Sequence, residues 1–193
     1  MLRIPFEVSD PAFTERIRPG LSPINHARWF AESKVRDCEE RFPDSVIIGS
    51  DTLIELDGEM LGKPGTLVEA GSMLRRLSGR QHAIHTAVAI AGNGTCASET
   101  AVETVRVWFK PLRDEDVERY LQTGESMGKA GAYAIQGHGG DLIERIDGDY
   151  TTAVGLPLRL LSTMLQKRGI AIPISIDALY RERPYPNWTR FAS

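Results

Sequence analysis

The sequence predicts an α/β fold: a central twisted mixed sheet with flanking helices. Three observations support that class. Apolar residues recur at helical spacing over residues 25–40, an unbroken apolar run at 45–49 is typical of a strand buried on both faces, and apolar or alternating segments at 81–91 and 101–109 predict two further strands. A chain of 193 residues is long enough to bury a core as one domain, with or without two lobes.

Turn and breaker residues predict the remaining elements. Residues 3–8 are expected to form a short strand ahead of a proline-rich loop, and Asp57-Gly58 predicts a tight turn. The other expected elements are a helix at 67–77, a turn at Gly92-Asn93-Gly94, a helix at 114–121, a glycine-rich loop at 124–140, a strand at 141–146 and a helix at 156–168. We expect one domain over residues 1–170 and an appended tail over 171–193, which has three prolines and little periodicity.

Composition and charge exclude several classes of protein. Lysine and arginine number 23 against 26 acidic residues, and the resulting net charge of −3 argues against a general nucleic-acid partner. Cys38 and Cys96 lie far apart and have neither disulfide-framework nor zinc spacing, which favours a reducing, cytoplasmic setting. No apolar run approaches the roughly 20 residues that span a membrane, so no membrane partner is expected.

Polar residues follow the apolar strand in the segment Ser50-Asp51-Thr52. Ligands gather at strand ends in open α/β sheets, where a carboxylate such as Asp51 can hold a divalent ion or accept a proton from water. Alternatively, Asp51 caps a turn and Thr52 bonds locally. Lys63, on a stiff loop between Gly62 and Pro64, and Lys34, on the first helix, are each either a phosphate-facing charge or a solvated one.

The glycine-rich segment 124–137 surrounds Lys129, Tyr133 and Gln136 with residues that let backbone approach a ligand closely. Its spacing fits neither a Walker loop nor a dinucleotide fingerprint, and a plain loop is the alternative. His82 and His85 lie three apart on a predicted strand, so they point to opposite faces and are not expected to share a metal ion.

Taken in order, these segments resemble the Maf family of nucleoside triphosphate pyrophosphatases over residues 4–170. The matching segments are Ile4-Pro5-Phe6-Glu7-Val8, Ala31-Glu32-Ser33-Lys34, Ser50-Asp51-Thr52, Leu61-Gly62-Lys63-Pro64, Leu77-Ser78-Gly79-Arg80-Gln81-His82, Lys129-Ala130-Gly131-Ala132-Tyr133, Ile135-Gln136-Gly137 and Val154-Gly155-Leu156-Pro157-Leu158. The resemblance implies a two-lobed fold with a cleft, as in inosine triphosphate pyrophosphatases. It also implies hydrolysis of a nucleoside triphosphate substrate to monophosphate and pyrophosphate with a divalent cation, Mg²⁺ or Mn²⁺.

The resemblance also implies roles for individual residues. Asp51 matches the family's proton acceptor, and Lys34 and Lys63 match its phosphate-facing lysines. Glu15 matches an acidic residue of the cleft, and Asp51 and Glu15 are the expected metal ligands.

Two positions that separate the family's subclasses are Thr52 and Gln136, which resemble the dTTP/UTP type. A glutamine amide offers a donor and an acceptor, so it can pair with the N3–H and a carbonyl of uracil or thymine. The subclass that prefers 7-methyl-GTP is expected to have Gln and Glu at these positions. Arg80 and Lys129 are further expected substrate-binding residues.

The sequence also departs from the family's pattern. It contains no Ser-x-Ser-Pro-Arg-Arg, which family members have before the Ile-Pro-Phe segment, so a phosphate-binding loop and a core strand are expected to be missing unless the natural start lies upstream of Met1. The tail at 171–193 is a candidate to cover the sheet edge left by that strand. Gly128 and Ala134 stand where the family usually has Asp and Gly.

An active enzyme is therefore not the only hypothesis. A catalytically impaired Maf-like protein would bind nucleotides or a partner without hydrolysis, and a nucleic-acid-binding regulator is the third hypothesis, which the net charge opposes. A homodimer is the candidate assembly.

Overall fold

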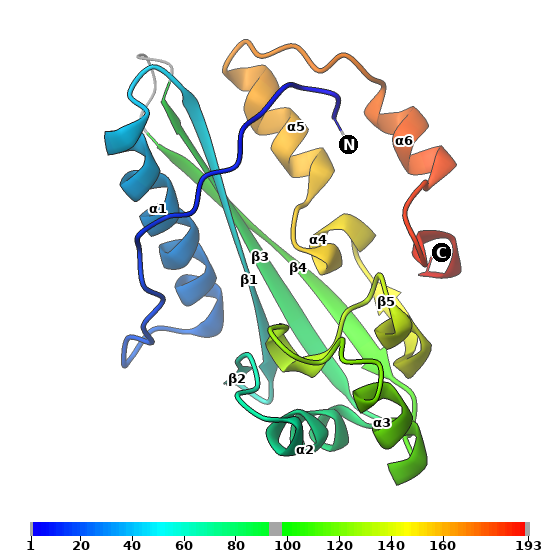
Figure 1. Ribbon diagram of the computed structural model, residues 1–193. Coiled ribbons are helices and arrows are strands. Elements are labelled where there is room, and N and C mark those ends of the chain that lie inside the picture. The colour runs from blue at the N-terminus through cyan, green and yellow to red at the C-terminus, as the bar shows by residue number, and fades with distance from the viewer. Residues whose placement is uncertain (1, 93–97, 192–193) are drawn as a thin grey trace.

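A computed structural model describes residues 2–92 and 98–191 (Figure 1). Its strands are β1 (Val46–Leu56), β2 (Glu59–Leu61), β3 (Gln81–Gly92), β4 (Glu99–Phe109) and β5 (Ile143–Asp147). Its α-helices are α1 (Pro23–Arg41), α2 (Leu67–Leu77), α3 (Asp114–Leu121), α4 (Tyr150–Val154), α5 (Leu158–Lys167) and α6 (Ile176–Glu182), and its short 3₁₀ helices are η1 (Ala130–Ala132), η2 (His138–Leu142) and η3 (Trp188–Phe191). The α/β class is confirmed.

The five strands are ordered β2-β1-β3-β4-β5 in one open sheet. Each pairing between these strands is antiparallel, so the expectation of a mixed sheet is corrected. The reason lies in the connections, because β1 turns directly into β2, and β3 is followed by its neighbour β4 after a short connection, as in hairpins. β2 pairs with β1 only at Ile54, Glu55 and Leu56, whereas β3 pairs along nearly the whole length of β1.

Helix α1 covers one face of the sheet through small side chains. Ala31 and Val35 of α1 pack against Ala87 and Ala89 of β3 in a cluster that is almost fully buried. Gly49 of β1 permits this close approach, because an added Cβ would lie 2.7 Å from Val35 Cγ2 and 2.9 Å from the Ala31 carbonyl oxygen. The helix is thereby held close enough for a long side chain to reach the middle of β1.

The larger core lies on the other face of the sheet, beneath α4 and α5. The apolar stripe of α5, with Leu158, Leu161 and Leu165 all buried, joins this core as its spacing predicts. In Figure 1, α1 lies on one side of the long strands and α4 and α5 on the other, with α6 outside them, while α2 and α3 lie near one end of the sheet.

The C-terminal residues contain more regular structure than the sequence indicates. α6 and η3 dock by burying Leu179, Trp188 and Phe191. Their polar contacts go to α4, to α5 and to the glycine-rich region, as in the pair between Arg159 and Asp177. The hydrogen bonds and ion pairs of α6 and η3 named here do not reach β1, and cover of the edge beside that strand by residues 171–193 stays a prediction.

Several local expectations are corrected. Residues 3–8 form no strand, because Pro5 lacks an amide hydrogen and no neighbouring strand pairs with the segment within the described chain. Asp51 lies in the middle of β1, because pairing with β3 continues through it to Glu55. The expected turn at Gly92-Asn93-Gly94 lies largely outside the described residues, as does Cys96, whereas Cys38 is a free buried thiol. Within residues 2–92 and 98–191, none of the helices combines the length and the apolar character of a membrane span.

Candidate active site

A cavity of about 520 Å³ opens between α1, β1 and the glycine-rich region. It brings together seven of the eight residues expected to act on or bind a substrate. These are Glu15, Lys34, Asp51, Thr52, Lys63, Lys129 and Gln136. Three of them are lysines and two are carboxylates, so the polar lining carries an excess of positive charge suited to an anionic ligand.

The cavity reaches both faces of β1. Because successive side chains of a strand point to opposite faces, Asp51 faces α1 and Thr52 faces α4. Both residues nevertheless line the same cavity, since β2 pairs with β1 only from Ile54 onward. A ligand lying across this part of the strand therefore meets Lys34 and Asp51 on one side and Thr52 and Gln136 on the other.

Lys34 joins two carboxylates at the α1 side of the cavity. Its Nζ lies 2.6 Å from Asp51 Oδ1 and 2.7 Å from Glu15 Oε1. Lys63 approaches the same cluster, with its Nζ 3.8 Å from Glu15 Oε2. Lys63 is well exposed, whereas Asp51 is only 7% exposed, so the cluster runs from solvent into the protein.

Burial and the neighbouring charges shift the pKa values of Asp51, Glu15 and Lys34 in opposing directions. Burial raises the pKa of Asp51, and the nearby negative charge of Glu15 raises it further, although the Lys34 ammonium opposes both effects. Burial would also raise the pKa of Glu15, but Lys34 and Lys63 outweigh it and lower that pKa. Burial disfavours the charged form of Lys34, yet its hydrogen bonds to the two carboxylates raise its pKa overall. Folding thus shifts the pKa of Asp51 upward and the pKa of Glu15 downward.

The cavity offers carboxylate oxygens of the kind that bind a divalent cation. Asp51 Oδ2 is buried and has no hydrogen-bond partner among the described residues. Together with Glu15 it supplies two carboxylates at one cavity, while no cluster of three or more Asp, Glu, His or Cys side chains with metal-binding geometry occurs in residues 2–92 and 98–191. Mg²⁺ typically takes one or two carboxylates and completes its shell with water and substrate phosphates, so these residues fit such an ion.

Glu15 belongs to an irregular segment that is tied to α1 at two points. The Ala12 amide donates to Asp37 Oδ2 at 2.8 Å, and the Arg18 amide donates to His26 Nε2 at 2.9 Å. Phe13 lies between these ties and packs its ring edge-on against Trp29, with 5.4 Å between ring centroids. These contacts hold the backbone on both sides of Glu15 against the helix that carries Lys34.

The hydroxyl proton of Thr52 is already committed within the protein. Thr52 Oγ1 lies 3.0 Å from Thr86 Oγ1 on the neighbouring strand, and Thr86 Oγ1 donates its own proton to the Thr152 carbonyl at 2.8 Å. Thr86 has only one proton, so in its bond with Thr52 it accepts, and Thr52 donates. Thr52 therefore offers the cavity lone pairs and no donor.

The glycine-rich region contributes the opposite wall of the cavity. Lys129 and Gln136 are exposed there, while Tyr133 between them is buried and hydrogen-bonds His82 at 2.7 Å. Burial lowers the pKa of His82 to about 3, so this pair is neutral at physiological pH. The neutral pair supports this wall from beneath without adding a charge. Lys129 and Gln136 line the cavity on either side of Tyr133 in the sequence.

Arg80 is the expected substrate-binding residue that does not join the others. Its guanidinium pairs with Asp57 at the turn between β1 and β2, and it is not part of the cavity lining. The two strand histidines are also separate, as predicted, because His82 bonds Tyr133 whereas His85 bonds Glu55 and Thr104.

Sequence reasoning missed residues that act behind the cavity wall. Thr86 comes directly before the apolar run 87–91 of β3, and its polar side chain was the only signal available. Asn187 donates to two carbonyls of the glycine-rich region, but its sequence neighbourhood gives no sign of that distant contact.

Comparison with known proteins identifies the family of this chain. A model of the family described as "Maf-like protein" matches residues 1–168. A dTTP/UTP pyrophosphatase of Bacillus velezensis is 44% identical over 170 residues, which are 88% of this chain and 89% of the relative. Proteins of the same name from Bacillus pumilus and Neisseria meningitidis are 38% and 42% identical, over 86% and 83% of this chain and 86% and 82% of their own. The chain belongs to the Maf-like protein family.

Proposed function

We propose that the protein is a nucleoside triphosphate pyrophosphatase that hydrolyses dTTP or UTP to the monophosphate and pyrophosphate. The names of its relatives support this reaction and these substrates. The observation that carries the proposal is the cluster at the cavity, where Lys34 bonds Asp51 and Glu15 and leaves Asp51 Oδ2 without a partner.

Asp51 is the group that activates water. Its burial raises the pKa of the carboxyl, and Lys34 holds Oδ1, so Oδ2 is the oxygen available to orient a water molecule and take its proton. The water oxygen bonds the α-phosphorus while the bond from that phosphorus to the bridging oxygen breaks. Pyrophosphate leaves with the electron pair of that bond, and the water proton passes to Asp51.

The lysines offset the charge of the triphosphate. Lys34 lies beside Asp51, and Lys63 and Lys129 lie farther out along the cavity, so a polyphosphate extending toward solvent meets a cation along its length. Fixed positive charges stabilise the negative charge that builds on the leaving pyrophosphate more than they stabilise the ground state. The outer lysines are exposed, which also leaves a route for pyrophosphate release.

Asp51 and Glu15 are the residues that would hold a divalent cation, Mg²⁺ or Mn²⁺. When bound, such an ion neutralises phosphate charge and orients the chain of phosphates. The lowered pKa of Glu15 keeps that carboxylate ionised at neutral pH, ready to bind a cation.

Thr52 and Gln136 read the base on the other side of β1. Thr52 presents only lone pairs, which suits the N3–H donor of uracil or thymine and does not suit the N3 acceptor of cytosine. The Gln136 amide can donate to a base carbonyl from the opposite wall. Together these groups match the pyrimidine edge that has a donor flanked by acceptors.

The proposal extends to the organisation of the protein. We propose that residues 1–170 form the catalytic domain, that residues 171–193 are an extension of it, and that the protein works in the cytoplasm. A homodimer is the proposed assembly, and light scattering of the purified protein tests it. A mass of about twice the 21.4 kDa of the chain is expected, and a mass of about 21.4 kDa would contradict the dimer.

Release of pyrophosphate tests the function. The purified protein is incubated with UTP, dTTP, CTP, ATP or GTP and Mg²⁺, and we expect pyrophosphate from UTP and dTTP. Asp51→Asn removes the base and should lose at least about 100-fold in kcat. Asp114→Asn is the matched control, because Asp114 is exposed in a surface pair with Arg75. Thermal stabilisation by UTP without pyrophosphate release would contradict the proposal and favour a binding protein.

A further inference from the structure

We propose that Asn187, in the C-terminal tail, is a positioning residue for Gln136 and thereby takes part in base recognition. The inference rests on the proposed function and extends it to residues beyond the range 1–168 that the family model matches. Asn187 Nδ2 donates to the carbonyls of Ile135 at 2.8 Å and Gly137 at 2.9 Å, one on each side of Gln136.

The loop around Gln136 is held from two sides. Asn187 binds its carbonyl groups, while Glu125 accepts hydrogen bonds from the amides of His138 at 3.2 Å and Gly139 at 3.4 Å. The space at the Asn187 contact is full, since a Cβ on Gly140 would lie 2.4 Å from Asn187 Nδ2. The backbone that carries Gln136 therefore depends on the placement of one amide group in the tail.

That amide group is itself firmly placed. Trp188, the next residue, is 4% exposed and stacks on Tyr150 and on Tyr185, with 5.5 Å between ring centroids in each case. The Tyr150 hydroxyl donates to the Pro186 carbonyl just before Asn187. These contacts fix the chain on both sides of Asn187 to α4, a helix whose last residues line the cavity.

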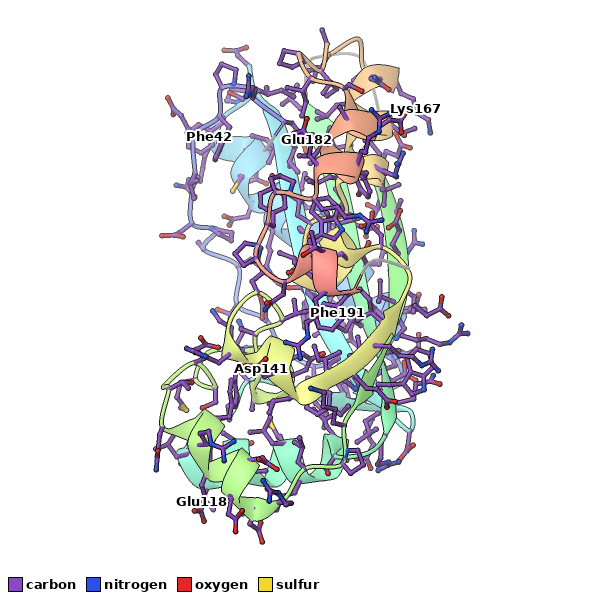
Figure 2. The ribbon with its side chains drawn as sticks, turned by 90° about the vertical axis from the view of Figure 1, so that its right-hand side faces the viewer. Phe42, Glu118, Asp141, Lys167, Glu182 and Phe191 are labelled. Carbon is purple, nitrogen blue, oxygen red and sulfur yellow. The ribbon has the colours of Figure 1, made fainter. Side chains whose placement is uncertain are left out.

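A second contact fastens the end of the tail to the same loop region. Arg190 Nη1 lies 2.6 Å from Asp141 Oδ1, and the Arg190 guanidinium holds the pKa of that carboxyl below its usual value. Figure 2 shows the labelled Phe191 and Asp141 on these adjoining segments, the last turn of the tail and the short helix η2 that leads into β5. Both side chains are exposed, and neither takes part in the bonds from Asn187 to the carbonyls beside Gln136, so Arg190→Gln changes the docking of the tail without removing those bonds.

The backbone of Asn187 also limits which residues fit. Its φ of 63° lies in the left-handed region, which Asn, Asp and Gly adopt more readily than other residues. Asn187→Gly keeps that conformation and removes the amide donor. Asn187→Asp keeps both the conformation and the shape but places acceptors opposite two carbonyl oxygens, so it cannot make either bond.

The experiment is a double-mutant cycle on base preference. The ratio of kcat/KM for UTP to that for GTP is measured for wild type, Gln136→Ala, Asn187→Gly and the double variant, with Arg190→Gln as the tail control. We expect Asn187→Gly to lower the ratio by about tenfold, as Gln136→Ala does, with no further fall in the double variant. Arg190→Gln should leave the ratio unchanged.

Asn187→Asp guards against a simple loss of folding, since it is expected to lower the ratio while the protein still unfolds cooperatively. Amide hydrogen exchange without nucleotide adds a readout independent of turnover, and exchange across residues 134–140 should quicken in both Asn187 variants but not in Arg190→Gln. An unchanged ratio, or additive losses in the double variant, would overturn the inference. If wild type releases no pyrophosphate from UTP, the proposed function fails instead. In that case, unchanged exchange at residues 134–140 in the Asn187 variants would show that Asn187 does not hold the backbone around Gln136.

Discussion

Lys34 Nζ lies 2.6 Å from Asp51 Oδ1, which places an ammonium group against the carboxylate that is the candidate base. The same nitrogen lies 2.7 Å from Glu15 Oε1, so one lysine keeps two carboxylates together at the cavity. The arrangement leaves the buried Asp51 Oδ2 without a hydrogen-bond partner among the described residues and places a cation beside it at the cavity.

Replacing Lys34 with methionine is expected to lower kcat/KM for UTP by at least about 100-fold, because one positioned charge at the transition state is lost. Lys34→Arg should recover part of the activity. Lys167→Met is the matched control, because Lys167 forms a surface pair with Glu99 away from the cavity. Pyrophosphate release measures all three variants, and a Lys34→Met enzyme as active as this control would contradict the role of the cluster.

The activity should depend on pH through Asp51. Burial raises the pKa of this group, so the acidic limb of the kcat/KM profile should have its midpoint above the usual value of about 3.9 for aspartate. The measurement is the pH dependence of pyrophosphate release, checked against thermal unfolding at each pH. A profile that stays flat down to the onset of acid unfolding would contradict Asp51 as the base.

The same shift makes a prediction about stability. A carboxyl whose pKa is raised by folding adds stability below its unfolded pKa, and that contribution disappears as the pH rises through the folded pKa. Asp51→Asn keeps an acceptor for Lys34 without the buried charge, so at pH 7 we expect an unfolding temperature equal to or above that of wild type. Scanning calorimetry measures it, and a marked fall would mean that the ionised form of Asp51 stabilises the fold.

Glu15→Gln tests whether Glu15 is a ligand of the divalent cation. Removing one of two candidate carboxylate ligands should raise the Mg²⁺ concentration for half-maximal activity by roughly tenfold, with a smaller loss of kcat at saturating Mg²⁺. Glu7→Gln, an exposed residue of the same irregular segment, is the control. Equal Mg²⁺ dependence in wild type and Glu15→Gln would remove Glu15 from the metal site.

Thr86→Val tests whether the hydrogen bond from Thr52 to Thr86 determines the choice of base. Without the Thr86 acceptor, the Thr52 hydroxyl is free to donate to the N3 of cytosine, and the preference for UTP over CTP should fall between about threefold and tenfold, the effect of one neutral hydrogen bond. Thr86→Ser should restore it, and Thr163→Val on α5 should not change it. The Gly155 amide still binds the Thr152 carbonyl, so folding is expected to survive.

Sequence patterns predict the elements that are determined locally. α2 and α3 have the predicted bounds, because Thr66 caps α2 and acidic residues begin α3. α4 was not predicted, because five residues are too few for a periodic signal and its Asp149 cap resembles a turn residue. The length of β1 was underestimated because its polar residues line a cavity in mid-strand, where they look like the end of a strand.

The residues of the candidate site also fall into those that sequence motifs predict and those that only tertiary packing reveals. Asp51, Lys34 and Lys63 were found through the order of short motifs, and the fold brings them together. Arg80 belongs to one of those motifs, but its side chain pairs with Asp57, a contact that depends on the geometry of the β1–β2 turn. Asn187 and Thr86 act through partners far away in the sequence, and only the packing of α4 and the tail brings those partners together.

The most direct test of the mechanism is the position of the oxygen that enters from water. The enzyme hydrolyses UTP with Mg²⁺ in water enriched in ¹⁸O, and mass spectrometry of the separated products locates the label. Attack on the α-phosphorus by a water held at Asp51 predicts ¹⁸O in UMP and unlabelled pyrophosphate. Label in pyrophosphate would place the attack on the β-phosphorus and contradict the account.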